Sequence, residues 1–194
     1  MPTLATPAIP AGSLASTPQP LLPVDAELSL RPWRVSDAED VCAVFEDPEI
    51  QRWHVRRADS VAEARDWIAQ WQRHWPDETG ASWAVVDAGH GTLLGRASLK
   101  SFALPDGVAE VAYWTAPAAR GRGVCPRAVR ALCDWALHTA GFHRLEIEHS
   151  TANPASCRVA VKAGFTEEGV RRGAARHADG WHDMHVHALV RGDG

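Results

Sequence analysis

The stretch RGRGVCPR, residues 120–127, places two glycines and three arginines between an apolar run and a pattern typical of a helix. A loop that leads from a strand into a helix aims several backbone N–H groups at one point, where the helix dipole adds positive potential. Gly121 and Gly123 carry no side chain that would block an anion. Pro126 fits the first turn of a helix. The stretch is therefore suited to bind a pyrophosphate, with a plain turn as the alternative.

Two common phosphate-binding loops do not fit this stretch. The sequence contains no G-x-x-x-x-G-K-[ST] run, and a dinucleotide-binding loop needs G-x-G-x-x-G after the first strand of a βαβ unit. Here Gly121 and Gly123 are followed by Pro126, and the loop lies late in the chain. A nucleotide-binding protein that uses the same loop stays open as an alternative.

The elements around the loop predict an α+β fold, with a mixed sheet covered by helices. Alternating apolar residues predict strands, and Ser36–Glu39, Ser60–Glu63 and Asn153 are expected to cap helices. Trp67, Trp71 and Trp75 share one face of the second helix. The expected strands are 27–33, 82–87, 92–102, 107–116 and 144–150, followed by two around the turn 178–180, and the later helices are 126–139 and 154–164.

The chain of 194 residues fits one domain, at residues 25–194. Residues 1–24 contain six of the thirteen prolines and no charged residue, which predicts a disordered Pro/Ala-rich tail. The net charge of −4 and the lack of a basic run argue against binding nucleic acid. No apolar run reaches the ~20 residues that span a membrane. The four cysteines form no C-x-x-C pair and fit a reducing cytoplasm. A monomer and a homodimer both remain open.

Several ordered motifs together resemble the GCN5-related N-acetyltransferases (GNAT). The loop reads Arg120-x-x-Gly123-x-Cys125, close to the R-x-x-G-x-[GA] of that family. AEVAYWTAP precedes it, and NPASCRVAVKAGF follows. The hairpin DGWHDMHVHAL resembles the ribosomal-protein (RimJ/RimL-like) subgroup. The resemblance covers residues 27–190 and implies a GNAT fold, with a mixed, mostly antiparallel sheet of about seven strands. It also implies direct transfer of an acetyl group from acetyl-CoA to a primary amine within a ternary complex.

The resemblance assigns the acetyl-CoA site residue by residue. In the family the fourth and fifth strands splay apart, and the pantetheine arm lies in the gap. Asn153 would hydrogen-bond the arm from one side, and the backbone of Tyr113, Trp114 and Thr115 would bind it from the other. The pyrophosphate would lie on the amides of Arg120, Gly121, Arg122, Gly123, Val124 and Cys125.

The resemblance also indicates the catalytic residues. Ser156 matches the serine of N-x-x-S and would protonate the leaving thiolate, unless it is only a surface serine. Glu110 is the candidate base, because strand alternation places it beside the cleft with Ala112 and Trp114; a solvated glutamate is the alternative. The subgroup can carry a glutamate 19 residues after the serine, but this chain has Ala175 there. That departure puts a ribosomal-protein substrate in doubt.

Aromatic and histidine residues complete the expectations. Trp53, His54 and Trp71 are candidates to line the acceptor site, although the stripe with Trp67 and Trp75 is more simply core. Cys125 is expected to pack in the loop rather than to react. No metal site is expected, because His177, His182, His185 and His187 read as ordinary hairpin histidines; one of them, or His149, is a candidate to assist the base. Another donor (a different acyl-CoA or an aminoacyl-tRNA) and a non-catalytic acyl-CoA-binding module remain as alternatives.

Overall fold

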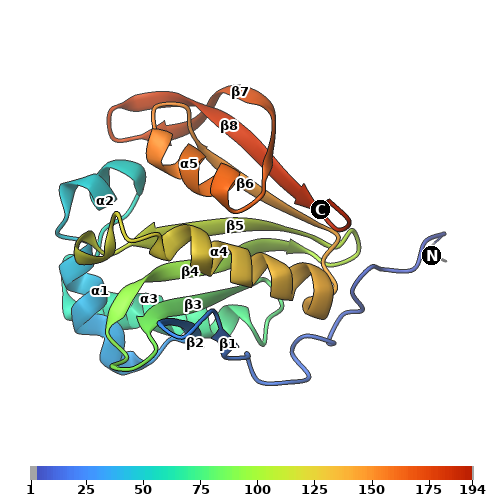
Figure 1. The fold of residues 1–194 in the computed structure, drawn as a ribbon, viewed down its shortest axis with the longest axis horizontal. Coiled ribbons are helices and arrows are strands. Elements are labelled where there is room, and N and C mark those ends of the chain that lie inside the picture. Colours follow the sequence, from blue (N-terminus) through green and yellow to red (C-terminus); the bar gives the residue numbers. More distant parts are fainter. Residues whose placement is uncertain (1–3, 194) are drawn as a thin grey trace.

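The computed structural model describes residues 4–193, which form one eight-stranded sheet with helices on both faces (Figure 1). The strand order is β1-β2-β3-β4-β5-β6-β8-β7, and every neighbouring pair is antiparallel except β5 with β6. The strands are β1 (Leu22–Pro23), β2 (Leu28–Pro32), β3 (Gly80–Asp87), β4 (Leu93–Ala103), β5 (Val108–Thr115), β6 (Arg144–Ser150), β7 (Thr166–His177) and β8 (Gly180–Val190). The predicted α+β class and the mixed, mostly antiparallel sheet are confirmed.

Five α-helices accompany the sheet: α1 (Ala38–Val44), α2 (Pro48–Trp53), α3 (Val61–His74), α4 (Val124–Trp135) and α5 (Pro154–Lys162). Ser60 and Asn153 cap α3 and α5 as predicted. The predicted Ser36–Glu39 cap is wrong, because Asp37 instead accepts from the backbone N–H of Arg34 and pairs with the buried Arg31. None of the helices in the described residues is long and apolar enough to cross a membrane.

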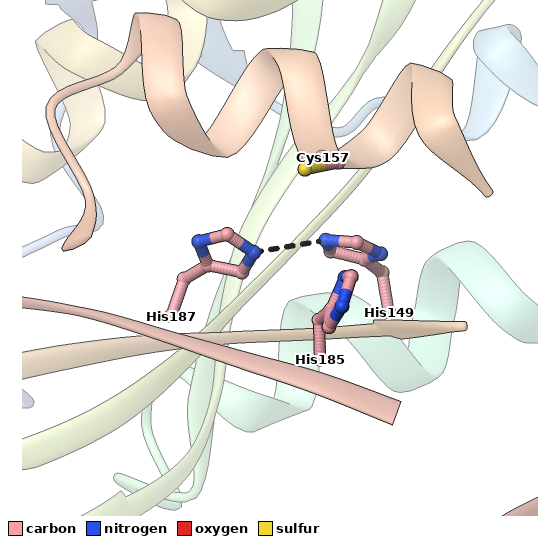
Figure 2. Close-up of side chains that lie close together, drawn as sticks. All are labelled: His149, Cys157, His185 and His187. Carbon is pink, nitrogen blue, oxygen red and sulfur yellow. Dashed lines mark hydrogen bonds between the residues drawn. The ribbon is translucent and has the colours of Figure 1, made fainter. Parts of the chain in front are cut away.

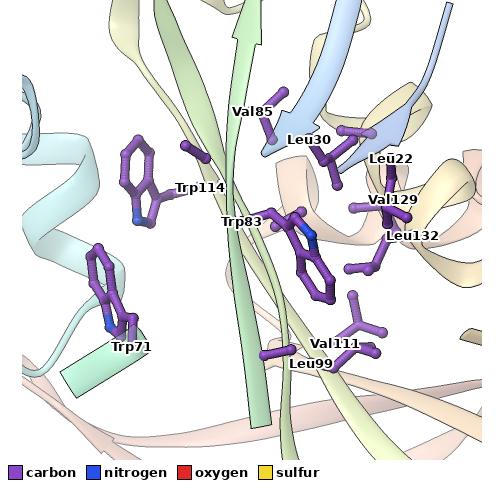
Figure 3. Packing of buried hydrophobic residues seen from close by; sticks show 14 of the residues in the cluster. Leu22, Leu30, Trp71, Trp83, Val85, Leu99, Val111, Trp114, Val129 and Leu132 are labelled. Carbon is purple, nitrogen blue, oxygen red and sulfur yellow. The ribbon is translucent and has the colours of Figure 1, made fainter. Parts of the chain in front are cut away.

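The core lies on both faces of the sheet (Figure 3). Trp114 and Trp71 occupy the face covered by α1 and α3, whereas Trp83 packs on the other face against Val129 and Leu132 of α4. Trp71 and Trp75 are buried and Trp67 is half-buried, so the tryptophan stripe of α3 belongs mainly to the core. Large aromatic side chains on both faces fix the sheet between two helical layers.

The gap that positions the site opens where β5 leaves β6. These strands pair in parallel only from Val108 opposite Arg144 to Glu110 opposite Glu146. Beyond that point β5 continues through Val111–Thr115 and β6 through 147–150 without pairing to each other. Backbone groups along this edge of β5 are therefore available to a ligand, as the predicted splay requires.

The N-terminal segment differs from the disordered tail that the sequence predicted. In its described part, from residue 4 onward, Ile9 and Leu14 are buried. The carboxylate of Glu78 accepts hydrogen bonds from the backbone N–H groups of Gly12, Leu14 and Ala15. Leu22 and Pro23 form β1, which accounts for the eighth strand. The Pro/Ala-rich composition concealed apolar residues that dock on the domain. Residues 1–3 lie outside the described part.

Candidate active site

Two cavities meet where β5 and β6 diverge. The first has a volume of about 280 Å³ and reaches from Thr115 and Cys125 to the start of α5. The second, of about 450 Å³, contains Glu110 and extends under the β7–β8 hairpin. The two cavities share five lining residues, Trp53, His54, Tyr113, Asn153 and Ser156. A donor in the first cavity and an acceptor in the second would therefore meet beside Ser156.

The loop before α4 has the backbone conformation of an anion-binding loop. Gly121 and Gly123 have φ values of 74° and 70°, in the left-handed region that favours glycine. α4 begins at Val124, directly after Gly123. A Cβ built on either glycine meets nothing within 4 Å, so the space above them is open. The free N–H groups at the start of α4 can consequently approach a pyrophosphate closely.

The arginines around the loop are not all free to bind a ligand. Arg120 pairs with Asp47 at 2.8 Å. Arg127 pairs with Asp25 at 2.8 Å. Arg122 is exposed and makes no ion pair or side-chain hydrogen bond within residues 4–193. Binding of an anion here would depend mainly on backbone N–H groups and Arg122.

Cys125 lines the first cavity as a neutral thiol. It is half-buried, and burial raises its pKa to about 12. A thiol with such a pKa stays protonated at neutral pH and is a poor nucleophile. The geometry supports the predicted packing role, in which sulfur replaces the small residue usual at this position.

Ser156 is held by two neighbours at the junction of the cavities. Its backbone N–H donates to Oδ1 of Asn153 at 3.0 Å, the capping bond of α5. Its Oγ lies 2.9 Å from Oη of Tyr113, which is also 3.1 Å from the backbone oxygen of Ser156. Burial raises the pKa of Tyr113, so its hydroxyl stays protonated. Sequence reasoning assigned only the backbone of Tyr113 and missed this hydroxyl, because the contact joins residues 43 positions apart.

Glu110 lies in the second cavity but carries an ion pair. Its Oε1 is 2.6 Å from Nζ of Lys100, the residue directly opposite on β4. The side chain of Glu110 is 27% exposed. The structure thus places the predicted base in the cavity, yet the carboxylate must leave Lys100 before it can take a proton. Ala175 also lines this cavity and supplies no ionisable group.

The three predicted acceptor-site residues separate into two groups. Trp53 and His54 line both cavities, and burial lowers the pKa of His54 to about 4, so this imidazole is neutral. Trp71 instead packs under Arg96, whose guanidinium carbon lies 4.6 Å from its ring centroid. Arg96 itself lines the second cavity, and no carboxylate in the described residues pairs with it. Sequence reasoning missed this cation, since nothing near it forms a motif.

The C-terminal histidines also separate. His177 and His182 lie near Trp53, and Nδ1 of His182 is 2.7 Å from Oγ of Ser150. His185 and His187 face α5 instead, where His149 joins them. His149 lines the second cavity, so it remains a candidate to assist a base.

The comparisons with known proteins agree with this geometry. The profile of the acetyltransferase (GNAT) domain matches residues 27–166. A protein named "Probable N-acetyltransferase YjcK", from Bacillus subtilis, is 29% identical over 172 residues, which cover 84% of this chain and 94% of that protein. The chain therefore belongs to the acetyltransferase (GNAT) family and is an N-acetyltransferase.

Two solved structures share the fold of this chain. A RimL ribosomal L7/L12 alpha-N-protein acetyltransferase in complex with coenzyme A has a TM-score of 0.83 at 19% identity, covering 90% of this chain and all of that one. The microcin C7 self-immunity acetyltransferase MccE, in complex with acetyl-CoA and AMP, has a TM-score of 0.80 at 19% identity, covering 86% and 94%. At these identities the likeness shows the shared fold.

Proposed function

We propose that the protein transfers the acetyl group of acetyl-CoA directly to a primary amine, with both substrates bound at once. The observation that carries this proposal is the meeting of two cavities at Ser156, on either side of the gap between β5 and β6. The donor enters through the first cavity, with its pyrophosphate on the amides of 120–125 and its arm along Tyr113–Thr115. The acceptor enters through the second cavity. Holding both reactants in this way replaces a bimolecular encounter with an oriented attack.

The reaction balances with the groups at the junction. A neutral amine attacks the thioester carbonyl to form the C–N bond, the C–S bond breaks, and the sulfur leaves as a thiolate that takes the hydroxyl proton of Ser156. The proton that the nitrogen loses on becoming an amide nitrogen returns to Oγ of Ser156. The hydroxyl of Tyr113 can donate its hydrogen either to the backbone oxygen of Ser156, which can only accept, or to Oγ of Ser156. When Tyr113 donates to Oγ, the serine hydrogen is free to point at the sulfur. Tyr113 is thus a positioning residue for Ser156.

The acceptor must lose a proton before it attacks, because alkylammonium groups are charged at neutral pH. Glu110 is the base in this proposal, acting directly or through a water after its carboxylate leaves Lys100. His149, which also lines the second cavity, is the second candidate. No cysteine is assigned a covalent role, since the thiol of Cys125 stays neutral.

The first acceptor class to test is the α-amino group of a polypeptide. Relatives named as ribosomal-protein acetyltransferases support this choice, whereas Ala175 at the expected base position argues for small amines as the second class. Arg96, an unpaired cation in the second cavity, favours acceptors that carry a carboxylate near the amine. The free state of the four cysteines fits a cytoplasmic site of action.

The experiment is a thiol-release assay with acetyl-CoA across acidic, neutral and basic peptides and a panel of small amines. Release of CoA with matching acetylation of one acceptor class, detected by mass spectrometry, is the expected result. Acetyl-CoA binding without release across the whole panel would favour a non-catalytic acyl-CoA-binding module. Parallel reactions with longer acyl-CoA donors and with aminoacyl-tRNA separate the remaining donors.

A further inference from the structure

Three histidines and one cysteine converge between α5 and the last strands of the sheet (Figure 2). His149 of β6 lies opposite His185 of β8, and His187 is two residues further along the same strand, so all three rings project from one face. Cys157, in the first turn of α5, points its sulfur toward them. One ligand atom from each residue lies within 4.8 Å of those of the other three. Acetyl transfer gives no role to Cys157, His185 or His187.

Two of the four residues are buried and two are half-buried, and part of their hydrogen-bonding capacity is unused. His187 is fully buried and His149 is 5% exposed. Nδ1 of His185 and Nδ1 of His187 are buried and have no hydrogen-bond partner in the part of the chain that the structure describes. Buried polar atoms nearly always have a partner, so each exception needs a reason. An unfilled ligand role is one such reason for Nδ1 of His185, whereas His187 directs Nε2 rather than Nδ1 at His149.

In His149 and His185, a contact made by one ring nitrogen outside the cluster leaves the other nitrogen facing the cluster. Nδ1 of His149 is 2.9 Å from the backbone oxygen of Ser150. That oxygen can only accept, so Nδ1 carries the proton and Nε2 keeps a lone pair. Nε2 of His185 lies 3.8 Å from a carboxylate oxygen of Glu167. Carbonyl and carboxylate groups behind the second nitrogen are the usual supports of metal-binding histidines.

We propose that His149, Cys157, His185 and His187 form a zinc-binding site. Imidazole nitrogens and a thiolate are the ligands that Zn²⁺ prefers, in a tetrahedron with Zn–N bonds of about 2.0–2.1 Å. Such bonds place two ligand nitrogens about 3.3 Å apart. Nε2 of His149 and Nε2 of His187 are 3.2 Å apart. The other pairs, all within 4.8 Å, need to close by at most about 1.5 Å, which side-chain rotations supply.

Four protein ligands leave no open position, so the site is structural rather than catalytic. It joins α5 to β6 and β8 beside the reaction centre. Cys157 directly follows Ser156, and Asn153 caps the same helix. Zinc would therefore fix the helix turn that forms the shared wall of both cavities. His149 also lines the second cavity, which gives the ion a path of entry. With Nδ1 bonded to Ser150 and Nε2 bound to zinc, His149 could not act as the base, which leaves that role to Glu110.

The test uses the full chain without an affinity tag, freed of metal with a chelator, incubated with micromolar Zn²⁺ and then dialysed. We expect one Zn²⁺ per chain by elemental analysis. Co²⁺ should bind in its place with the intense visible bands of tetrahedral cobalt and a thiolate-to-cobalt charge-transfer band in the near ultraviolet. Cys157→Ser should remove the charge-transfer band and weaken Zn²⁺ binding by at least about 100-fold. Loss of a residue that only hydrogen-bonds a metal ligand costs up to about 100-fold, and loss of the ligand itself should cost at least as much.

Two control variants separate this site from incidental binding. Cys42→Ser changes another half-buried free cysteine, and His138→Gln changes an exposed histidine; both should bind Zn²⁺ and Co²⁺ as the parent does. His187→Gln should lose the metal, and circular dichroism of each metal-free variant shows whether the fold is kept. The proposal is overturned if the parent binds less than one ion per chain at micromolar Zn²⁺. Unchanged affinity and spectrum in Cys157→Ser, the conservative variant, would also overturn it.

Discussion

Replacement of Tyr113 by phenylalanine tests how the reaction centre is organised. The change removes only the hydroxyl that lies 2.9 Å from Oγ and 3.1 Å from the backbone oxygen of Ser156. One hydrogen bond contributes about 0.5–1.5 kcal/mol net, and about 1.36 kcal/mol in the barrier is tenfold in rate. We therefore expect Tyr113→Phe to lower kcat by about 2- to 13-fold. Acetyl-CoA affinity, measured by calorimetry, should stay unchanged because the backbone of β5 is untouched.

A double-mutant cycle separates positioning from an independent role. Loss of a general acid costs roughly 100-fold at the low end of its range, and the CoA thiolate leaves easily, so that end applies to Ser156→Ala. If Tyr113 acts only through Ser156, the double variant Tyr113→Phe/Ser156→Ala should be no slower than Ser156→Ala alone. A double variant whose loss equals the product of the two single losses would refute the reasoning. Steady-state kinetics at saturating acetyl-CoA provide the measurement.

Four further predictions address the loop, the base, the N-terminal segment and the buried histidines. Gly123→Asp should weaken acetyl-CoA binding by up to about 1000-fold, since like charges about 4 Å apart repel by ~4 kcal/mol near a surface. The control Gly123→Asn, equal in shape but uncharged, should weaken binding far less. Equal affinities of the two variants in calorimetry would contradict the assignment of the loop to the pyrophosphate. Glu110→Gln should lower turnover and change its pH profile with little effect on acetyl-CoA affinity, and unchanged turnover would remove Glu110 from the mechanism. Deletion of residues 1–20 should lower the thermal midpoint by several degrees, because burial of Ile9 and Leu14 contributes about 1.5–3 kcal/mol each; an unchanged midpoint in calorimetry would support the disordered tail instead. The pKa of His54 is lowered from 6.5 to about 4, mainly by burial, so as the pH drops from 6.5 to 4 the unfolded chain takes up a proton on His54 that the folded chain does not, and the free energy of unfolding should fall. Urea titrations should show a shallower fall for His54→Gln than for the parent. An equal slope would refute the lowered pKa of His54.

Local patterns in the sequence predicted the glycine loop before α4 and the start of α5. The start of α4 depends on glycines in the left-handed region, and the start of α5 depends on an asparagine followed by a proline. Both signals act between residues that are close in the sequence. The mixed, mostly antiparallel sheet and the splay between β5 and β6 came from the family resemblance, because strand pairing joins segments that are distant in the sequence. The start of the first helix shows the limit of local patterns: Ser36 does not cap it, and the carboxylate of Asp37 accepts from the backbone N–H of Arg34 and pairs with Arg31 on β2.

The parts of the site that were missed depend on contacts between distant residues. Lys100 lies opposite Glu110 only through the register of β4 with β5, and that register changed the interpretation of the base. Cys157 reaches His149 and His187 only because α5 packs on β6 and β8. Metal-binding motifs read from spacing alone cannot show such a set, which explains why no metal site was expected.

The most direct test of the central claim is the position of coenzyme A in a crystal structure of its complex with the protein. The account predicts the pyrophosphate on the amides of residues 120–125, the arm in the gap between β5 and β6, and the sulfur beside Oγ of Ser156. A coenzyme bound elsewhere, or a sulfur far from both Ser156 and the second cavity, would contradict it.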